Sequence, residues 1–111
     1  MVFALGVVLI ELCLGCPLED MRAPEDLDDF GNPNIFTDYM TAQRLIAEVY
    51  DEGGGRYGDV VRRCIHCDFD QPEVNFDVEA FCKAFLKGVI SPLWEDYDDF
   101  VSLSASQAIL D

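Results

Sequence analysis

Two Cys-x-x-Cys pairs are the residues of this chain whose types and spacing most readily suggest chemistry. Cys13 and Cys16 form the first pair, and Cys64 and Cys67 form the second, which includes His66. Four thiolates can hold zinc tetrahedrally, so these four cysteines define a candidate structural zinc module. Zinc knuckles place such pairs on tight polar turns, however, whereas Cys13 and Cys64 lie in apolar helical patterns. We therefore expect no metal and no cofactor, with the zinc module kept as an alternative.

Thiol redox chemistry is a less favoured interpretation of the same two Cys-x-x-Cys pairs. A reactive Cys-x-x-Cys pair needs a helix N-terminus to lower the thiol pKa. Both pairs lie toward the C-terminal ends of predicted helices, where the helix dipole disfavours a thiolate. The chain has five cysteines, an odd number, and most lie within apolar helical patterns. This usage favours reduced, buried thiols and a cytoplasmic protein over a disulfide scaffold.

No constellation of catalytic residues is recognisable. His66 is the only histidine, and no Ser or Cys stands at a nucleophile turn such as G-x-S-x-G. The run Gly53-Gly54-Gly55 lacks the Lys-Ser/Thr of a phosphate-binding loop. Carboxylates are abundant, but nothing indicates a cleft that would separate the pKa values of a pair. We expect no catalytic residue, and we predict that the chain is not an enzyme.

The charge balance excludes several classes of partner. The net charge is −15, with clusters of acids at residues 19–29 and 95–99. Such a surface repels nucleic-acid backbones and anionic membrane leaflets, so neither is an expected partner. We interpret the clusters chiefly as solvated surface. Their functional interpretation is a docking patch for a basic protein partner.

The elements that must position these residues are all helical. The chain has 111 residues and no internal repeats, which is typical of a single domain. Apolar spacing and breaker residues predict four helices around a core, at residues 2–14, 36–51, 58–67 and a last one that begins with Asp77 as its cap and has apolar positions as far as Tyr97. The acidic loop 18–34, the three glycines and the segment 68–76 join them.

The first and last predicted helices carry specific expectations. Residues 2–14 are apolar on nearly every face, which predicts a central helix buried on all sides with the other three packed around it. The run lacks a preceding Lys or Arg and contains Glu11, so it does not read as a signal peptide. A secreted cysteine-containing protein remains an alternative. Pro92 predicts a kink or break in the last helix, and residues 102–111 predict a polar tail that frays.

The stretch "VFALGVVLIELCLGCPL" resembles helix F of the protein-kinase C-terminal lobe. The matching residues are Phe3, Leu5, Gly6, Val7, Glu11, Leu12, Gly15 and Pro17. "VVRRCIHCDFDQP" is similar to kinase helix H through Cys64, Ile65 and Asp68, and the last predicted helix then corresponds to helix I. Nearly the whole chain resembles an uncharacterised fungal domain with a kinase-like C-terminal part, found in proteins related to the prion-inhibition and HeLo-type group.

The resemblance implies a fold but no activity. The Gly-rich loop, the ATP-binding Lys, the His-Arg-Asp loop and the Asp-Phe-Gly motif have no counterpart in this sequence, and phosphoryl transfer depends on them. Residues 1–101 are thus predicted to form an all-α, kinase C-lobe-like segment of four helices. Its expected role is that of a non-catalytic interaction or scaffold module, a truncated pseudokinase-like C-lobe of a fungal intracellular protein. The expected partner is a protein, either a basic one or the missing upstream kinase-like half.

Overall fold

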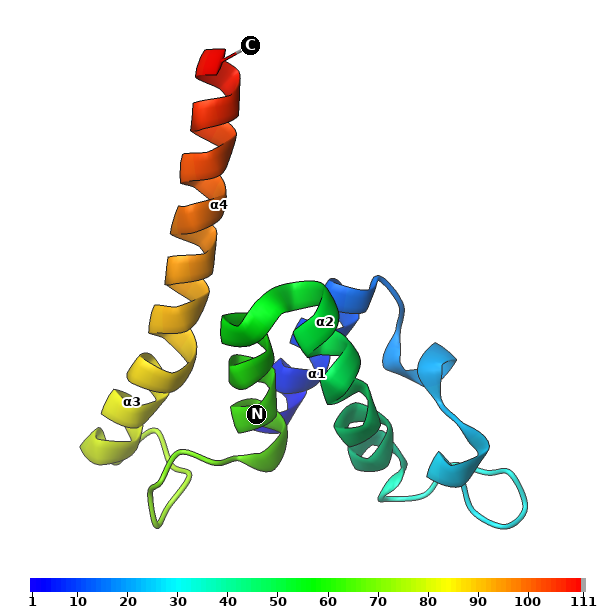
Figure 1. Ribbon diagram of the computed structural model, residues 1–111. Helices are drawn as coiled ribbons and strands as arrows, with labels where there is room; N and C mark the ends of the chain where they lie inside the picture. The colour runs from blue at the N-terminus through cyan, green and yellow to red at the C-terminus, as the bar shows by residue number, and fades with distance from the viewer. Residues whose placement is uncertain (111) are drawn as a thin grey trace. The chain divides into compact units, whose positions relative to one another are not determined.

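The computed structural model describes residues 1–110, with side chains described for residues 1–103, and within these bounds the chain is all-α, as predicted. Four α-helices, two 3₁₀ turns and one π-helical segment follow one another (Figure 1). Their bounds are α1 Val2–Leu14, η1 Leu18–Met21, η2 Pro24–Asp26, α2 Thr37–His66, α3 Glu79–Phe85, η3 Leu86–Ile90 and α4 Ser91–Leu110. The chain divides into two compact units, residues 1–68 and residues from 69 onward, where the sequence predicted one domain.

A glycine divides α2 into two arms. Gly54 has φ 85° and ψ 175°, a backbone conformation that only glycine adopts at low cost. Residues 37–53 form the first arm and residues 55–66 the second. The helix break predicted at Gly53-Gly54-Gly55 is therefore confirmed, and the two predicted helices become these arms. They extend closer to Gly54 than predicted, because a single non-helical residue suffices for the reversal.

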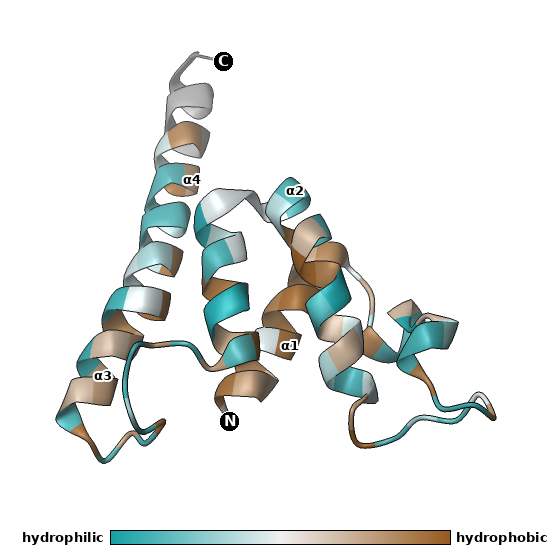
Figure 2. Ribbon diagram, turned by 60° about the horizontal axis from the view of Figure 1, so that its bottom comes forward, coloured by the Kyte–Doolittle hydropathy of each residue, from teal (hydrophilic) through white to brown (hydrophobic). Residues whose placement is uncertain are grey.

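Helix α1 lies between the two arms of α2 (Figures 1 and 2). The ring of Phe3 stacks on Tyr39 of the first arm, with centroids 6.5 Å apart. Along the second arm, Gly6 packs against Cys64 and Ile65, and the Tyr57 hydroxyl donates a hydrogen bond to the Leu9 carbonyl. The second arm thus runs antiparallel to α1. The core of this unit consists of Val2, Leu9, Ile10, Leu18, Ala42, Leu45, Val49, Val60, Val61, Cys64 and Ile65.

The predicted burial of α1 on all sides is wrong. Its bounds are as predicted, but Val8 is 47% exposed and Leu12 is 73% exposed. The two arms of α2 cover one side of α1 and leave the apolar residues of the opposite side in solvent. The last helix was also predicted to pack on α1. The two helices belong to different units, so this remains a prediction.

A buried carboxylate ties the acidic loop to α2. Asp26 is 2% exposed and accepts hydrogen bonds from the Ala23 amide, the Thr41 hydroxyl and the Arg44 guanidinium, at 2.9, 3.0 and 3.0 Å. Arg44 also donates to the Met21 carbonyl. The interpretation of the first acidic cluster as solvated surface is thus wrong for Asp26. Asp26 is far in sequence from Thr41 and Arg44, so local sequence patterns do not predict this contact.

The second unit is built around an aromatic cluster and one long helical run. The rings of Phe69, Phe76, Phe81 and Phe85 contact one another with centroids 5.0–6.2 Å apart. The cap predicted at Asp77 is wrong, because Val78 occupies the N-cap of α3 and makes no side-chain cap hydrogen bond. Asn75 organises this turn instead, since its side chain accepts a hydrogen bond from the Asp77 amide at 2.9 Å.

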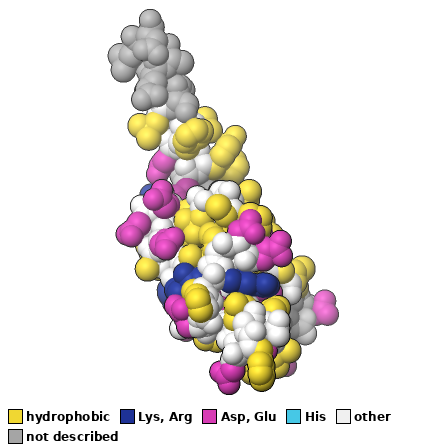
Figure 3. Space-filling model, turned by 90° about the vertical axis from the view of Figure 1, so that its right-hand side faces the viewer, with side chains coloured by type: hydrophobic (Ala, Val, Ile, Leu, Met, Phe, Trp, Pro, Cys, Tyr) yellow, Lys and Arg dark blue, Asp and Glu magenta, His cyan; other side chains and the backbone are white. Residues whose placement is uncertain are grey.

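The helical run passes Pro92 without breaking. The distortion takes the form of the π-helical segment η3, in which the Ser91 amide donates to the Leu86 carbonyl five residues earlier. This wider turn accommodates the proline, which has no amide hydrogen and would clash with the carbonyl four residues back. Helix α4 then continues through residues 102–110, which were predicted to be a fraying tail. Those residues contain no Gly or Pro, so nothing in them stops a helix. Hydrophobic side chains remain on the surface of the described part of α4 (Figure 3).

We predict that Gly6→Ala lowers the free energy of unfolding by about 1–3 kcal/mol. A Cβ at this position would lie 2.8 Å from Ile65 Cδ1 and 2.9 Å from Cys64 Cβ, so the helices must move apart. Gly55→Ala is the matched control, because its Cβ would have no neighbour within 4 Å, and it should be neutral or stabilising. Urea unfolding followed by circular dichroism measures both. Equal effects of the two substitutions would contradict the close packing of α1 on the second arm.

We also predict that Asp26 makes stability depend on pH. Burial raises the pKa of this carboxyl, but the hydrogen bonds from Ala23, Arg44 and Thr41 and the Arg44 charge together lower it below its usual range. Its contribution is therefore complete above the unfolded-state pKa of about 3.9 and is lost as the pH falls through the lower folded-state pKa.

The measurement compares the urea midpoints of the wild-type chain and Asp26→Asn across pH. The variant should be less stable by about 1–3 kcal/mol at neutral pH. The gap should narrow below about pH 4. The exposed Asp29→Asn serves as the control and should show no such gap. A gap for Asp26→Asn that stays constant down to strongly acidic pH would exclude the ionised carboxylate as its source.

Candidate functional site

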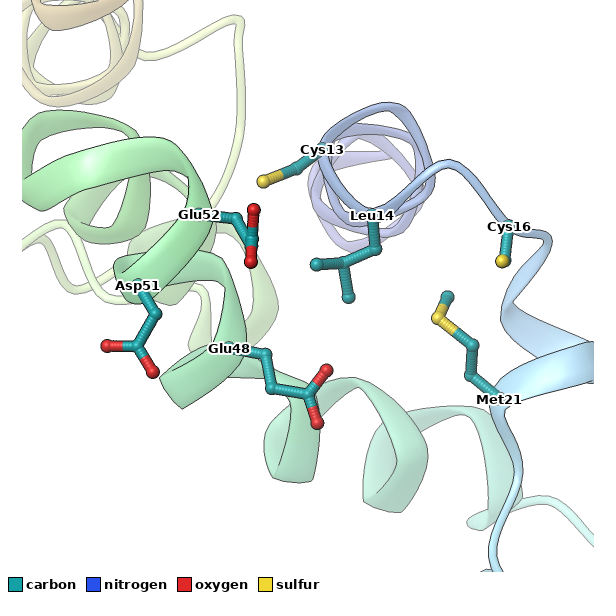
Figure 4. A pocket seen from close by; sticks show the side chains of 7 residues that line it. All are labelled: Cys13, Leu14, Cys16, Met21, Glu48, Asp51 and Glu52. Carbon is teal, nitrogen blue, oxygen red and sulfur yellow. The ribbon is translucent and has the colours of Figure 1, made fainter.

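The two cysteines of the first pair line a pocket beside the end of α1. The pocket has a volume of about 560 Å³ and is lined by Cys13, Leu14, Cys16, Met21, Glu48, Asp51 and Glu52. Cys13 lies on the side of Glu52, and Cys16 lies on the side of Met21, with Leu14 between them (Figure 4). Burial, and then the nearby charge of Glu52, raise the pKa of the Cys13 thiol. A raised pKa keeps this thiol protonated, whereas a nucleophilic cysteine must be a thiolate.

The second pair lies elsewhere in the first unit. Cys64 is fully buried where the second arm of α2 crosses Gly6, and burial, with the nearby Cys67, raises its pKa to about 11. Cys67 is exposed and ends α2 with a positive φ of 51°. Gly6 and Cys13 are seven residues apart on α1, which corresponds to roughly 10 Å along the helix.

The structure thus does not bring Cys13, Cys16, Cys64 and Cys67 together. Within the described part of the chain, no three His, Cys, Asp or Glu side chains are close enough to hold a metal ion. The pocket in Figure 4 therefore has acidic and sulfur-bearing walls without a convergent set of ligands.

His66 has a partner in the fold that the sequence did not indicate. Its Nδ1 atom lies 3.1 Å from the Tyr39 hydroxyl, and the two rings meet edge to face with centroids 5.9 Å apart. Tyr39 lies in the first turn of the first arm of α2, and His66 ends the second arm, so the pair joins the two open ends of the arms. This contact accounts for His66 as a structural residue.

The exposed face of α1 is the strongest candidate for a functional surface. Met1, Ala4, Val8 and Leu12 recur every three or four residues, so they share one side of the helix, and all four are exposed. Figure 2 shows the hydrophobic colouring of α1 along its length. A shallow hollow of about 410 Å³ adjoins this face and is lined by Val8, Glu11, Leu12, Gly15, Cys16 and Pro17. We call this side, with its hollow, the α1 face.

The single charged residue of α1 does not interrupt the apolar character of the face. Glu11 accepts a hydrogen bond from the Leu18 amide at 2.8 Å, so its carboxylate organises the turn after the helix. The remaining residues of Val2–Leu14 are uncharged. Contiguous exposed apolar surface of this kind marks sites of protein association. The sequence indicated the excess of apolar residues, but only the fold shows which side stays uncovered.

Comparison with known proteins gives no relative for this chain. No family model matches it, and no curated protein or solved structure shows significant similarity. The structure adds one bound: among the residues it describes, no helix combines the length and the apolar character needed to cross a bilayer.

We predict a graded reactivity of the cysteines toward a thiol-alkylating reagent. Cys16, Cys67 and Cys82 are exposed, Cys13 is half-buried and Cys64 is fully buried. The exposed thiols should be labelled first in the native protein, and Cys64 should be protected by its burial and its raised pKa of about 11. Peptide mass spectrometry after timed labelling reports each site. Labelling of all five thiols in urea is the control, and labelling of native Cys64 as fast as Cys16 would contradict the described core.

Proposed function

We propose that this chain is a non-catalytic protein-interaction module, a kinase C-lobe-like segment that uses the α1 face to bind a protein partner. The observation that carries the proposal is the exposure of Val8 and Leu12 on the most apolar helix of the chain. Covering apolar surface contributes roughly 25 cal/mol for each Å² removed from water. A partner that covers the α1 face therefore gains affinity without any group capable of catalysis.

Two of the residues that carry the kinase resemblance have structural roles in this fold. Gly6 allows the second arm of α2 to approach α1, and Glu11 holds the turn that follows the helix. Neither role requires ATP or a substrate, which favours a scaffold over a catalyst. On this proposal the chain is a pseudokinase-like part of a fungal intracellular protein.

The proposed occupant of the α1 face is the upstream half of such a kinase-like fold, or a partner protein that takes its place. Helix F is the buried pillar of a kinase C-lobe, so a counterpart exposed on one side lacks part of its usual cover. The argument rests on the uncovered apolar side of α1 and on the sequence resemblance. The proposed location is the cytoplasm, where the five cysteines would stay reduced.

We predict that Leu12→Glu abolishes association through the α1 face while leaving the fold intact. The wild-type chain, reduced and treated with chelator, should bind a hydrophobic dye and associate as its concentration rises, because the face is uncovered. Leu12 is 73% exposed, so a carboxylate there is solvated. Association should fall at least several-fold and dye binding should decrease, without change in the circular dichroism spectrum. Light scattering coupled to size-exclusion chromatography measures the association.

Phe30→Glu is the matched control for this experiment. Phe30 is 89% exposed in the acidic loop, away from α1, so the same chemical change should leave dye binding and association as in the wild type. A wild-type chain that stays monomeric, melts cooperatively and does not bind the dye would refute the proposal. Equal losses in both variants would assign the effect to added charge and not to the α1 face.

A further inference from the structure

The second unit carries a separate apolar stripe, which runs from Ile90, the last residue of η3, onto α4. Trp94, Tyr97 and Phe100 are 64%, 59% and 69% exposed, and Ile90 and Val101 are exposed beside them. At 100° per residue, these five residues and the half-buried Leu93 fall within an arc of roughly 120°. We call this set, Ile90, Leu93, Trp94, Tyr97, Phe100 and Val101, the α4 stripe.

The α4 stripe has the spacing of a helix that packs against another helix. Ile90, Leu93, Tyr97 and Phe100 follow the alternating steps of three and four residues that define a coiled-coil seam. Four of its members, Ile90, Leu93, Trp94 and Tyr97, line a shallow hollow of about 340 Å³. Large aromatic side chains around a hollow are typical of the centre of a protein interface.

The charge of α4 restricts what can cover the stripe. The helix carries Glu95, Asp96, Asp98 and Asp99 and no Lys, Arg or His anywhere in Ser91–Leu110. In projection, Asp96 and Asp98 flank the stripe on opposite sides, each about 40° beyond its edge. Figure 3 shows acidic side chains close to the hydrophobic ones on this part of the molecule.

This arrangement disfavours two simple occupants. Pairing α4 with a second copy of itself would bring acidic flanks together, and like charges across an interface cost affinity. An anionic membrane surface is disfavoured for the same reason, in a chain whose net charge is −15. A helix with an apolar face flanked by Lys and Arg satisfies both the stripe and its acidic borders.

We propose that α4 is a docking site for a basic amphipathic helix of a partner protein. The apolar face of the partner helix covers the α4 stripe, and its Lys and Arg residues lie along the acidic borders and pair with Asp98. This site is independent of the α1 face and of the kinase resemblance, because it lies in the other unit and rests on different residues.

The full chain supplies its own reporter for this proposal. Trp94 is the only tryptophan and belongs to the stripe, at its edge beside Asp98, so its fluorescence should shift to the blue when a partner covers it. The probe is a synthetic peptide of about five helical turns that places Leu on one face and Lys on the other. One control peptide has Glu in place of Lys, and another has the same Leu and Lys content in an order without an apolar face. Only the first peptide should bind, and its affinity should fall as salt increases.

Two pairs of variants test the surface itself. Tyr97→Asp places a charge in the stripe and should weaken peptide binding at least about tenfold, whereas Phe30→Asp changes an exposed aromatic residue of the first unit and should not. Asp98→Lys reverses a flanking charge and should weaken binding several-fold, whereas Asp29→Lys makes the same charge change elsewhere and should not. Circular dichroism checks that each variant keeps its helix content.

The outcomes separate the alternatives. Peptide binding that responds to Tyr97→Asp and Asp98→Lys supports the proposal. A blue-shifted Trp94 in the isolated monomer would show that the chain covers its own stripe, and a concentration-dependent shift with dimer formation would show that a second copy does. Either result overturns the proposal, as does binding of the acidic peptide or of the peptide without an apolar face. Because Leu12→Glu leaves the α4 stripe unchanged, failure of the α1 proposal would be distinguished from failure of this one.

Discussion

The first unit depends on one backbone conformation, the positive φ of Gly54 with an extended ψ. A side chain at this position would clash with the backbone, so any other residue would carry a cost of the order of 1–3 kcal/mol. The reversal lets one stretch of chain supply both walls of the core, with α1 between them. Tyr50 and Gly58 illustrate how tightly the arms meet near the bend, since a Cβ on Gly58 would lie 2.2 Å from the Tyr50 ring.

The two arms of α2 bury one side of α1 and leave the opposite side of the helix uncovered. Leu9 and Ile10 are in the core, while Val8 and Leu12, their near neighbours in sequence, are in solvent. A helix that is apolar all round normally has neighbours all round. The mismatch between the apolar content of α1 and the cover that α2 provides is thus a property of the fold, and it is the physical basis of the binding role proposed for this helix.

Much of this architecture could be predicted from local sequence signals, because breakers and periodicity act over a few residues. The bounds of α1, the glycine break in α2 and the helical character of the last third follow from such signals. The contacts that decide function are longer in range. The burial of Asp26 depends on Thr41 and Arg44, and the separation of Cys13 from Cys64 depends on how α1 crosses the second arm. Periodicity identifies an apolar helix face but not whether another element covers it, and so the sequence placed all of α1 in the core.

The net charge of −15 influences what can cover both exposed apolar surfaces, the α1 face and the α4 stripe. Two copies of a strongly acidic chain repel one another at long range, so self-association through the uncovered apolar side chains should weaken as the ionic strength falls. The same field accelerates the approach of a basic partner and disfavours acidic ones. For the proposed partners, apolar contact would supply affinity at short range, and charge would select among them at longer range. In α4 both features are present on a single helix, since the stripe that gains from being covered is bordered by Asp96 and Asp98 and the helix has no cation of its own. Selection by charge there requires no catalytic or metal-binding group.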